Sequence, residues 1–158
     1  MRILIVYMTH HGTTEKVVEK LMELMGKSVT DVVNLEHDSI PDLSRYGTII
    51  IGGSIHVGQI QLGIKQFCRD YKQELLNKKL GLFICYMNKE QGMQEFENAF
   101  PGELRSHARA AGLFGGEFLF EKMNFMERFI IRMVANEKKS RSAINYPAIA
   151  KFAASFVV

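Results

Sequence analysis

Residues 3–14 read ILIVYMTHHGTT, an apolar run followed directly by a short polar loop. The run Ile3–Tyr7 is almost continuously aliphatic, which is typical of a strand that is covered on both faces. After the loop, Thr13–Met25 places apolar side chains at helical spacing, with Glu and Lys on the opposite side. The stretch therefore predicts a buried strand, a loop and an amphipathic helix.

Further apolar runs continue this alternation along the chain. We predict strands at Val29–Leu35, Thr48–Ile51 and Leu80–Tyr86, and a weaker fifth strand at Gly116–Phe120. Continuous rather than alternating apolar runs indicate a parallel sheet flanked by helices. The order of elements predicts a doubly wound α/β domain with right-handed crossovers. Ligands of such folds bind beyond the carboxyl ends of the strands.

The remaining helices are expected between and after these strands. The residues Ile64–Leu75 carry a narrow apolar stripe of one helix. A similar period runs from Met93 to Ala111, and Pro101 predicts a start or a kink within it. A last helix is predicted over Pro147–Val158, with the proline in its first turn.

The composition indicates one soluble globular domain over residues 1–158. Twenty Lys and Arg against 17 Asp and Glu give a net charge of +3, too small an excess to indicate nucleic-acid binding. The two Cys lack the spacing of a disulfide framework or a zinc site. No stretch has the pattern of a signal peptide or a membrane span. We therefore expect a cytoplasmic protein, with contact to the inner face of the cell membrane as an open alternative.

The loop after the first strand combines hydroxyl groups with a glycine at a helix N-terminus. Thr9, Gly12, Thr13 and Thr14 lie within six residues of one another. A helix N-terminus of this kind offers backbone N–H groups and a favourable dipole to a phosphate. Simple capping of the helix by a threonine is the alternative. The loop has neither the Lys of a P-loop nor a G-x-G-x-x-G motif, which disfavours ATP and NAD.

Two more loops follow predicted strands at the same edge. Residues 52–59 read GGSIHVGQ, and the paired glycines predict either a close approach to a ligand or a simple turn into a helix. Residues 85–92 read CYMNKEQG and offer an aromatic ring, an amide and a turn. Cys85 and Cys68 lack an evident His or Lys neighbour that would lower a thiol pKa, so we expect neither to be a catalytic nucleophile.

Taken together, the three loops resemble those of the flavodoxin family, and the resemblance covers essentially the whole chain. That family's first loop reads T/S-x-T-G-x-T, and here it is Thr9-His10-His11-Gly12-Thr13-Thr14, with His11 in place of a hydroxyl residue. The resemblance implies a five-stranded parallel sheet of order 2-1-3-4-5 and a noncovalent FMN, whose phosphate this loop would hold. The residues implied at the isoalloxazine ring are Ser54, Ile55, His56, Val57, Gly58, Tyr86, Met87 and Asn88.

The ring site departs from the family in one respect, because the chain has no tryptophan to stack on the flavin. We expect Ile55, His56 or Tyr86 to cover the ring instead. Backbone groups at Gly58 are expected to hydrogen-bond the flavin edge near N5. No side chain is identified as an obligatory acid or base. His56 is the one catalytic candidate, because its intrinsic pKa is near neutral, and packing against the flavin is the alternative.

Two tracts are more specifically similar to the flavodoxin-like, menaquinone-dependent protoporphyrinogen dehydrogenases. They are IIGGSIHVG at 50–58 and GGEFLFEKM at 115–123, which leads into FMERFIIRM at 125–133. The resemblance implies an FMN oxidoreductase of haem biosynthesis that oxidises protoporphyrinogen IX and passes the electrons to a quinone. Lys122, Arg128 and Arg132 are the candidates for pairing with the propionates of this substrate.

Residues 125–134 form an insertion after the predicted fifth strand. On a helical wheel their apolar side chains fill about half of the circumference, with Arg128 and Arg132 opposite. Such a helix can pack in the core, cover a hydrophobic substrate, meet a second copy of the chain or rest on a membrane surface, and these alternatives stay open. The positive net charge disfavours a typically acidic electron carrier. An electron-carrier role and a noncatalytic FMN-binding role nevertheless stay as alternatives.

Overall fold

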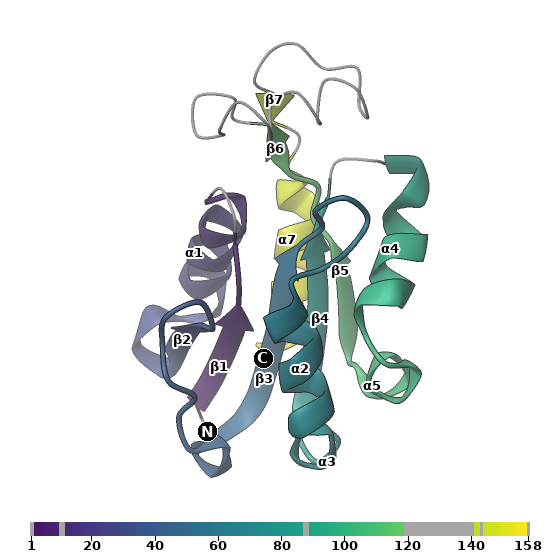
Figure 1. The fold of residues 1–158 in the computed structure, drawn as a ribbon. Helices are drawn as coiled ribbons and strands as arrows, with labels where there is room; N and C mark the ends of the chain where they lie inside the picture. Colours follow the sequence, from purple (N-terminus) through teal and green to yellow (C-terminus); the bar gives the residue numbers. More distant parts are fainter. Residues whose placement is uncertain (1, 10–11, 87–88, 119–140, 143, 158) are drawn as a thin grey trace.

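The computed structural model describes residues 2–9, 12–86, 89–118, 141–142 and 144–157. Its main sheet has five parallel strands in the order β2-β1-β3-β4-β5 (Figure 1). The strands are β1 (Arg2–Tyr7), β2 (Thr30–Asn34), β3 (Tyr46–Ser54), β4 (Lys79–Cys85) and β5 (Ala110–Leu113). The predicted fold class and strand order are confirmed.

Helices cover both faces of the sheet (Figure 1). They are α1 (Thr13–Met25), α2 (Leu62–Asp70), α3 (Lys72–Leu75), α4 (Gly92–Ala99), α5 (Gly102–His107) and α7 (Tyr146–Ala154). Short 3-10 turns lie at η1 (Lys27–Val29), η2 (Leu43–Arg45) and η3 (Lys89–Gln91). Buried side chains of α1 and α7 pack on one face of the sheet, and those of α2, α4 and α5 pack on the other.

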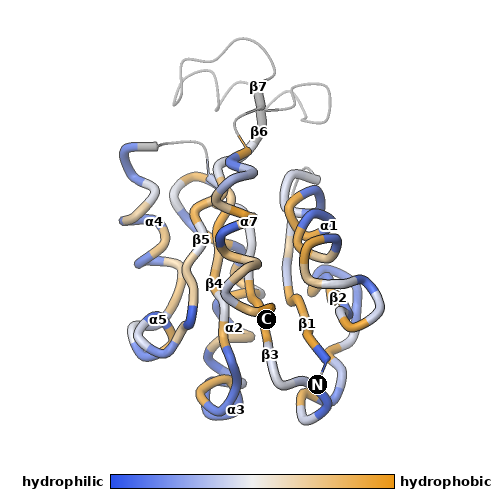
Figure 2. The backbone as a smooth tube through the Cα atoms, turned by 180° about the vertical axis from the view of Figure 1, so that it is seen from behind, coloured by the Kyte–Doolittle hydropathy of each residue, from blue (hydrophilic) through white to orange (hydrophobic). Residues whose placement is uncertain are grey.

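The side chains of β1 show why its sequence is continuously apolar. Ile3 and Ile5 pack toward α1 and α7, whereas Leu4 and Val6 pack toward α2 and α4. Because alternate side chains of a strand point to opposite faces, a strand with two covered faces needs apolar residues throughout. Figure 2 shows β1 as hydrophobic along most of its length.

The prediction that Gly116–Phe120 is the fifth strand of the main sheet is wrong: Glu117–Phe118 forms a strand, β6, but in a separate ribbon. The fifth strand is Ala110–Leu113, a run of two alanines, a glycine and a leucine with little apolar volume. The ring of Phe114 fills the space beside it, since a Cβ at Gly112 would lie 2.3 Å from Phe114 Cζ. The core volume therefore comes from the residue after the strand, so the strand itself carries a weak hydrophobic signal.

The helices agree with the sequence except where the backbone interrupts them. The predicted helix Thr13–Met25 is confirmed. The stripe over Ile64–Leu75 is divided into α2 and α3 at Tyr71, and the stripe over Met93–Ala111 gives α4, then α5, and ends before Ala111, which lies in β5. Pro101 immediately precedes α5, as predicted, because it cannot donate a helical hydrogen bond. The last helix, α7, ends at Ala154, earlier than predicted.

Gly52 and Gly53 belong to β3 and not to a turn, which corrects the predicted end of this strand at Ile51. A Cβ at Gly52 would lie 2.1 Å from the Phe83 ring, and one at Gly53 would lie 2.5 Å from Gln61 Oε1. The glycines are therefore required by close side-chain packing across the strand.

A two-stranded antiparallel ribbon stands at the carboxyl edge of the main sheet (Figure 1). It pairs β6 (Glu117–Phe118) with β7 (Arg141–Ser142). The predicted inserted helix at 125–134 lies between these strands in sequence and outside the described residues. Within the part of the chain that the structure describes, no helix has the length and apolarity needed to cross a bilayer.

Candidate functional site

Three loops meet at the carboxyl edge of the sheet, because β1, β3 and β4 are neighbours there. Met8 N–H donates to the carbonyl of Gly52 at 3.4 Å, which ties the first loop to β3. Ile55 N–H donates to the carbonyl of Cys85 at 2.8 Å, which ties the second loop to β4. The strand ends thus bring the predicted loops together at one place.

The first loop enters α1 through a glycine in the left-handed region. Gly12 has φ 83° and immediately precedes the helix. Its N–H donates to Thr9 Oγ1 at 3.1 Å, so the Thr9 hydroxyl fixes the loop. The cap of α1 is Gly12, without a side-chain hydrogen bond, and simple capping by a threonine is therefore not what the structure shows.

The hydroxyl of Thr14 is fully buried and has no nitrogen or oxygen hydrogen-bond partner among the described residues; its polar neighbour is the weakly hydrogen-bonding thiol of Cys85. Buried hydroxyl groups normally have a partner, because an unpaired one costs free energy. Thr14 lies in the first turn of α1, where the first backbone N–H groups also lack intrahelical acceptors. An anion bound here would accept from these groups and would meet the positive end of the helix dipole. The residues present therefore fit a phosphate group.

The second loop is closed at its base by two hydrogen bonds between Ser54 and Gln61. Ser54 N–H donates to Gln61 Oε1 at 3.1 Å, and Gln61 Nε2 donates to Ser54 Oγ at 2.7 Å. Gln61 is buried, and the missing side chain of Gly53 leaves the room for its amide. We call this pair of residues the Ser54–Gln61 clamp. It fixes both ends of the loop that carries most of the predicted ring contacts.

A tight turn forms the tip of this loop, at residues 56–59. His56 N–H donates to the carbonyl of Gln59 at 2.8 Å, and Gln59 N–H donates back to His56 at 3.1 Å. Both central residues have positive φ, 50° at Val57 and 77° at Gly58, as in a type I′ turn. A β-branched residue is strained in this region, and the Val57 side chain is also 70% exposed. Val57 is therefore a conformationally unfavourable residue at the tip of the second loop.

The third loop is described only at Tyr86, Lys89 and beyond. Tyr86 N–H donates to the carbonyl of Gly115 at 2.8 Å, which ties this loop to the chain that enters β6. A Cβ at Gly92 would lie 2.7 Å from Tyr86 Cε2, so the ring packs against the first residue of α4. The role of Tyr86 as a cover for the flavin stays a prediction.

The other predicted site residues fall into two groups. Thr13, Ile55 and His56 lie at the carboxyl edge of the sheet with the residues described above, Thr13 being buried and the other two half-buried. The second group has seven members, which the structure does not describe. Those outside the described residues are His10, His11, Met87, Asn88, Lys122, Arg128 and Arg132.

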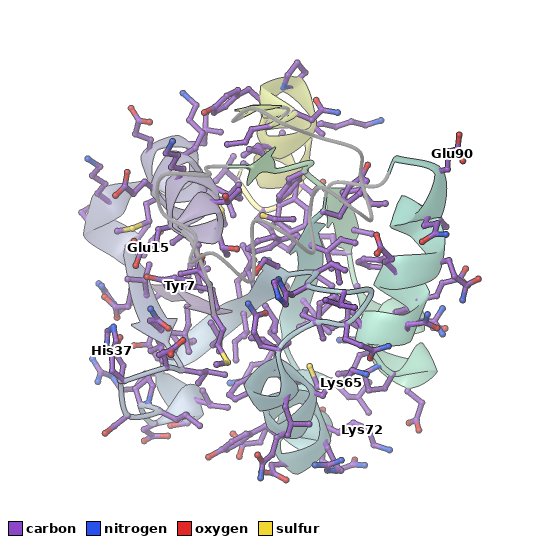
Figure 3. All side chains as sticks on the ribbon, turned by 45° about the horizontal axis from the view of Figure 1, so that its top comes forward. Tyr7, Glu15, His37, Lys65, Lys72 and Glu90 are labelled. Carbon is purple, nitrogen blue, oxygen red and sulfur yellow. The ribbon has the colours of Figure 1, made fainter. Side chains whose placement is uncertain are left out.

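Burial raises the pKa of three side chains, Tyr7, Cys68 and Cys85. Burial is the main cause that raises the pKa of Tyr7, and the carboxylate of Glu15 raises it further. Figure 3 shows these two side chains close together, at the end of β1 and the start of α1. Burial raises the pKa of both Cys68 and Cys85 to about 12, which agrees with the expectation that neither is a nucleophile.

Gln61 is part of the site in the structure, although it is not among the residues predicted from the sequence. Its only signal is a polar residue at the start of an amphipathic helix, and nothing in the sequence shows that its amide reaches back to Ser54. Such a contact depends on how the loop folds over the end of β3.

Comparisons with known proteins agree with the fold described above. A short-chain flavodoxin associated with a non-canonical PDU bacterial microcompartment has a TM-score of 0.60 and 13% identity, over 98% of this chain and 96% of that one. Two-electron reduced flavodoxin from Megasphaera elsdenii has a TM-score of 0.56 and 15% identity, over 97% and 96% of the two chains.

Rubredoxin oxygen:oxidoreductase from Desulfovibrio gigas has a TM-score of 0.57 and 14% identity, over 99% of this chain. Our chain spans only 37% of the length of that protein. No curated protein sequence gave a significant match. Residues 4–145 match the sequence profile described as a flavodoxin domain. Together with the five-stranded sheet of order β2-β1-β3-β4-β5, this match shows that the chain belongs to the flavodoxin domain family.

Proposed function

We propose that this chain binds FMN noncovalently and uses it to oxidise a porphyrinogen, with a quinone as the electron acceptor. The observation that carries FMN binding is the buried, unpartnered hydroxyl of Thr14 in the first turn of α1, among three loops at one edge of the sheet. Membership of the flavodoxin domain family supports the same cofactor. When bound, FMN supplies a ring that accepts and releases electrons.

The chain's own residues would bind and orient the cofactor. Thr9, Gly12, Thr13 and Thr14 would hold the phosphate, with His10 and His11 from the same loop. The second loop would lie along the ring, held in place by the Ser54–Gln61 clamp. Orientation by a fixed loop matters because electron and proton transfer need short, constant distances. His56 stays the candidate for proton transfer, with flavin packing as the alternative role.

Two features support a porphyrinogen as the substrate: the position of the insertion between β6 and β7, and the positive net charge of the chain. The chain that enters and leaves residues 119–140 forms β6 and β7 at the same edge as the three loops, and Gly115 is hydrogen-bonded to Tyr86 of the third loop. A substrate held by this segment would therefore be near the ring. The net charge of +3 suits a substrate with propionates, for which Lys122, Arg128 and Arg132 are the proposed partners. Each two-electron step would transfer two electrons and two protons to one quinone.

The proposal also includes contact of the chain with a membrane surface. A quinone dissolves in the membrane, so we propose a peripheral contact of residues 125–134 with anionic lipid. Self-association through the same residues is the competing use of an apolar helix face. Sedimentation with anionic and neutral vesicles, followed by measurement of molecular mass in solution, distinguishes the two.

An electron-carrier role is the second candidate function. It is favoured by the two flavodoxins that this chain matches over 96% of their length. A carrier should take single electrons from a flavoprotein reductase and should not oxidise porphyrinogen. Anaerobic incubation with protoporphyrinogen IX and menadione, followed by porphyrin fluorescence, decides between them. A protein that binds FMN and does neither would be a noncatalytic binding protein.

The substitution Thr14→Val tests the observation that carries FMN binding. It removes only a hydroxyl that has no partner, so the FMN-free protein should keep or gain stability. FMN affinity should fall about tenfold, because a charge-assisted hydrogen bond to phosphate is lost. Thr30→Val is the matched control: its hydroxyl donates to the carbonyl of Gly26 at 2.7 Å, so stability should fall and FMN affinity should not. Unchanged FMN affinity in Thr14→Val contradicts the proposed phosphate site.

A further inference from the structure

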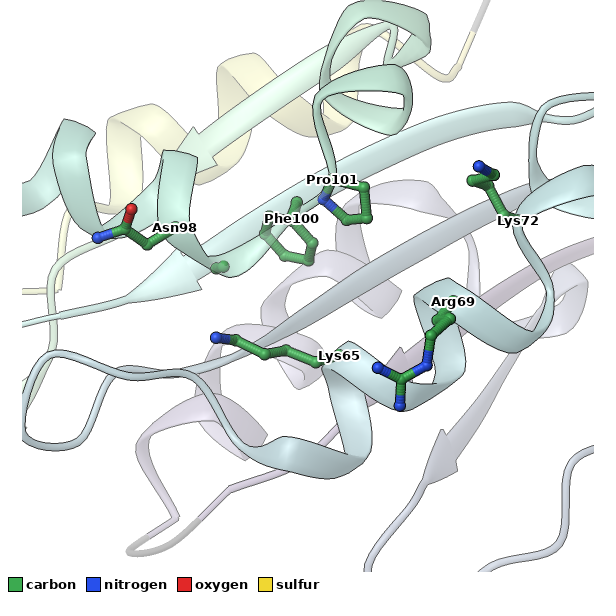
Figure 4. Close-up of a pocket in the computed structure, with 7 residues that line it drawn as sticks. Lys65, Arg69, Lys72, Asn98, Phe100 and Pro101 are labelled. Carbon is green, nitrogen blue, oxygen red and sulfur yellow. The ribbon is translucent and has the colours of Figure 1, made fainter.

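A basic groove lies between α2–α3 and α4–α5, and of the three loops it contacts the second, through Lys65 (Figure 4). Its volume is about 360 Å³, within the range of small-molecule sites. Lys65, Arg69 and Lys72 line it from one side, and Asn98, Phe100 and Pro101 from the other. None of these residues belongs to the predicted flavin site.

The positive charges of the groove are largely uncompensated. Lys72 Nζ pairs with Glu103 Oε1 at 3.0 Å, but Lys65 Nζ donates to a neutral amide, Gln59 Oε1, at 2.9 Å. Arg69 has no ion pair or hydrogen bond with any described residue. No carboxylate is among the described residues that line the groove. Lys65 and Arg69 therefore leave about two positive charges available, four residues apart on one helix face, where like charges repel.

Apart from Asn98, the opposite wall is apolar, and it is fixed by packing. Phe100 is buried and packs against Phe96, with 5.4 Å between the ring centroids. The carbonyl of Phe100 accepts from Arg105 Nε at 3.0 Å, and Pro101 restricts the backbone that follows. A wall of this kind offers a preformed surface to the carbon skeleton of a ligand, and such a surface needs little ordering on binding.

We propose that this groove is a binding site for a small organic dianion, with two carboxylate or phosphate charges on a compact apolar body. The two uncompensated cations set the charge of the ligand, and the partly exposed Pro101, backed by the buried Phe100, receives its carbon skeleton. The volume is sufficient for a small molecule. The site shares no lining residue with the predicted flavin site and does not depend on the porphyrinogen proposal.

Lys65 couples the groove to the second loop. Its hydrogen-bond acceptor, Gln59, closes the tight turn at residues 56–59. A dianion that pairs with Lys65 breaks the hydrogen bond between Lys65 Nζ and Gln59 Oε1. The second loop, which would face the flavin, then becomes more mobile. Because coupling between two binding sites is reciprocal, FMN and the dianion should each weaken the binding of the other by the same factor.

Isothermal titration of phthalate into FMN-loaded and FMN-free protein, at constant ionic strength, tests the site. Phthalate should bind saturably and about tenfold more tightly than benzoate, which has the same ring and one charge. Arg69→Ala should weaken phthalate binding about tenfold. Lys151→Ala, which removes an exposed cation on the opposite face of the sheet, should not. Absence of saturable binding, equal affinity for benzoate, or an equal loss in Lys151→Ala overturns the proposal. Titration of the FMN-free protein tests the dianion site even if the protein proves not to bind FMN.

The coupling has a separate readout. Saturating phthalate should raise the dissociation constant of FMN by about two- to fivefold, as followed by flavin fluorescence. In Lys65→Met the hydrogen bond to Gln59 is already absent, so phthalate should leave FMN affinity unchanged in this variant. An unchanged FMN affinity in the unmodified protein, or the same shift in Lys65→Met, refutes coupling through Lys65.

Discussion

The Ser54–Gln61 clamp predicts that the amide of Gln61 stabilises both the fold and the cofactor loop. Gln61→Met keeps the length and much of the volume of the side chain and removes both of its hydrogen bonds with Ser54. Each such bond contributes about 1 kcal/mol, and the partly buried N–H of Ser54 is left without its acceptor. We therefore expect the free energy of unfolding to fall by about 2–3 kcal/mol.

This loss should appear in two assays. Urea unfolding followed by circular dichroism gives the free energy, and the melting temperature should fall by about 5–10 °C for a domain of this size. A loop without its fixed base loses preorganisation, so FMN affinity should also fall, by about tenfold. Gln66→Met, at an exposed position of α2, is the matched control and should change neither quantity. If Gln61→Met is no more destabilising than Gln66→Met, the clamp does not fix the loop as argued.

Three further predictions concern single residues. Val57→Asn should stabilise the protein by about 1 kcal/mol in urea unfolding, because asparagine tolerates the positive φ of this exposed position; a loss of stability would contradict the strain. Gly52→Ala should destabilise by about 2–4 kcal/mol or prevent folding, since its Cβ would lie 2.1 Å from the Phe83 ring. Hydrogen bonds from Arg2 and Tyr46 lower the pKa of Asp31. Its stabilising effect is therefore present above the unfolded pKa of about 4 and is lost as pH falls through the lower, folded pKa. The stability difference from Asp31→Asn should shrink across this acidic window and stay constant near neutral pH.

The elements that the sequence predicts well are those whose signal is local. Helix α1 has its predicted bounds because Gly12 and Gly26 flank an unbroken amphipathic period. The strands β1 and β4 are nearly continuous apolar runs with two covered faces. The fifth strand was misplaced because Ala110–Leu113 carries little hydrophobic volume, whereas the more apolar tract at 116–120 follows it. A pattern of hydrophobicity locates buried volume, and here Phe114 supplies that volume from outside the strand.

The candidate site, like the fold, has parts that the sequence predicts and parts that it does not. From residue types and spacing the sequence predicts a phosphate site in the loop with Thr9, Gly12 and Thr14; the structure places this loop at the N-terminus of α1, and phosphate binding stays a prediction. The Ser54–Gln61 clamp and the reason for Gly53 could not, since both depend on one side chain folding back over a strand. The basic groove could not be predicted from the sequence either, because cations at helical spacing are the normal pattern of a solvated helix face.

The distribution of unfavourable features over the sheet argues that its carboxyl edge is built for a ligand. At the amino edge the polar groups are paired: Asp31 accepts from both Arg2 and Tyr46. At the carboxyl edge Thr14 buries an unpaired hydroxyl and Val57 keeps a positive φ with its side chain exposed. Each of these features lowers the stability of the ligand-free fold, and a ligand that gives Thr14 a partner and covers Val57 offsets both. Binding should therefore raise the melting temperature, and Thr14→Val should reduce that increase while leaving the ligand-free melting temperature unchanged or higher.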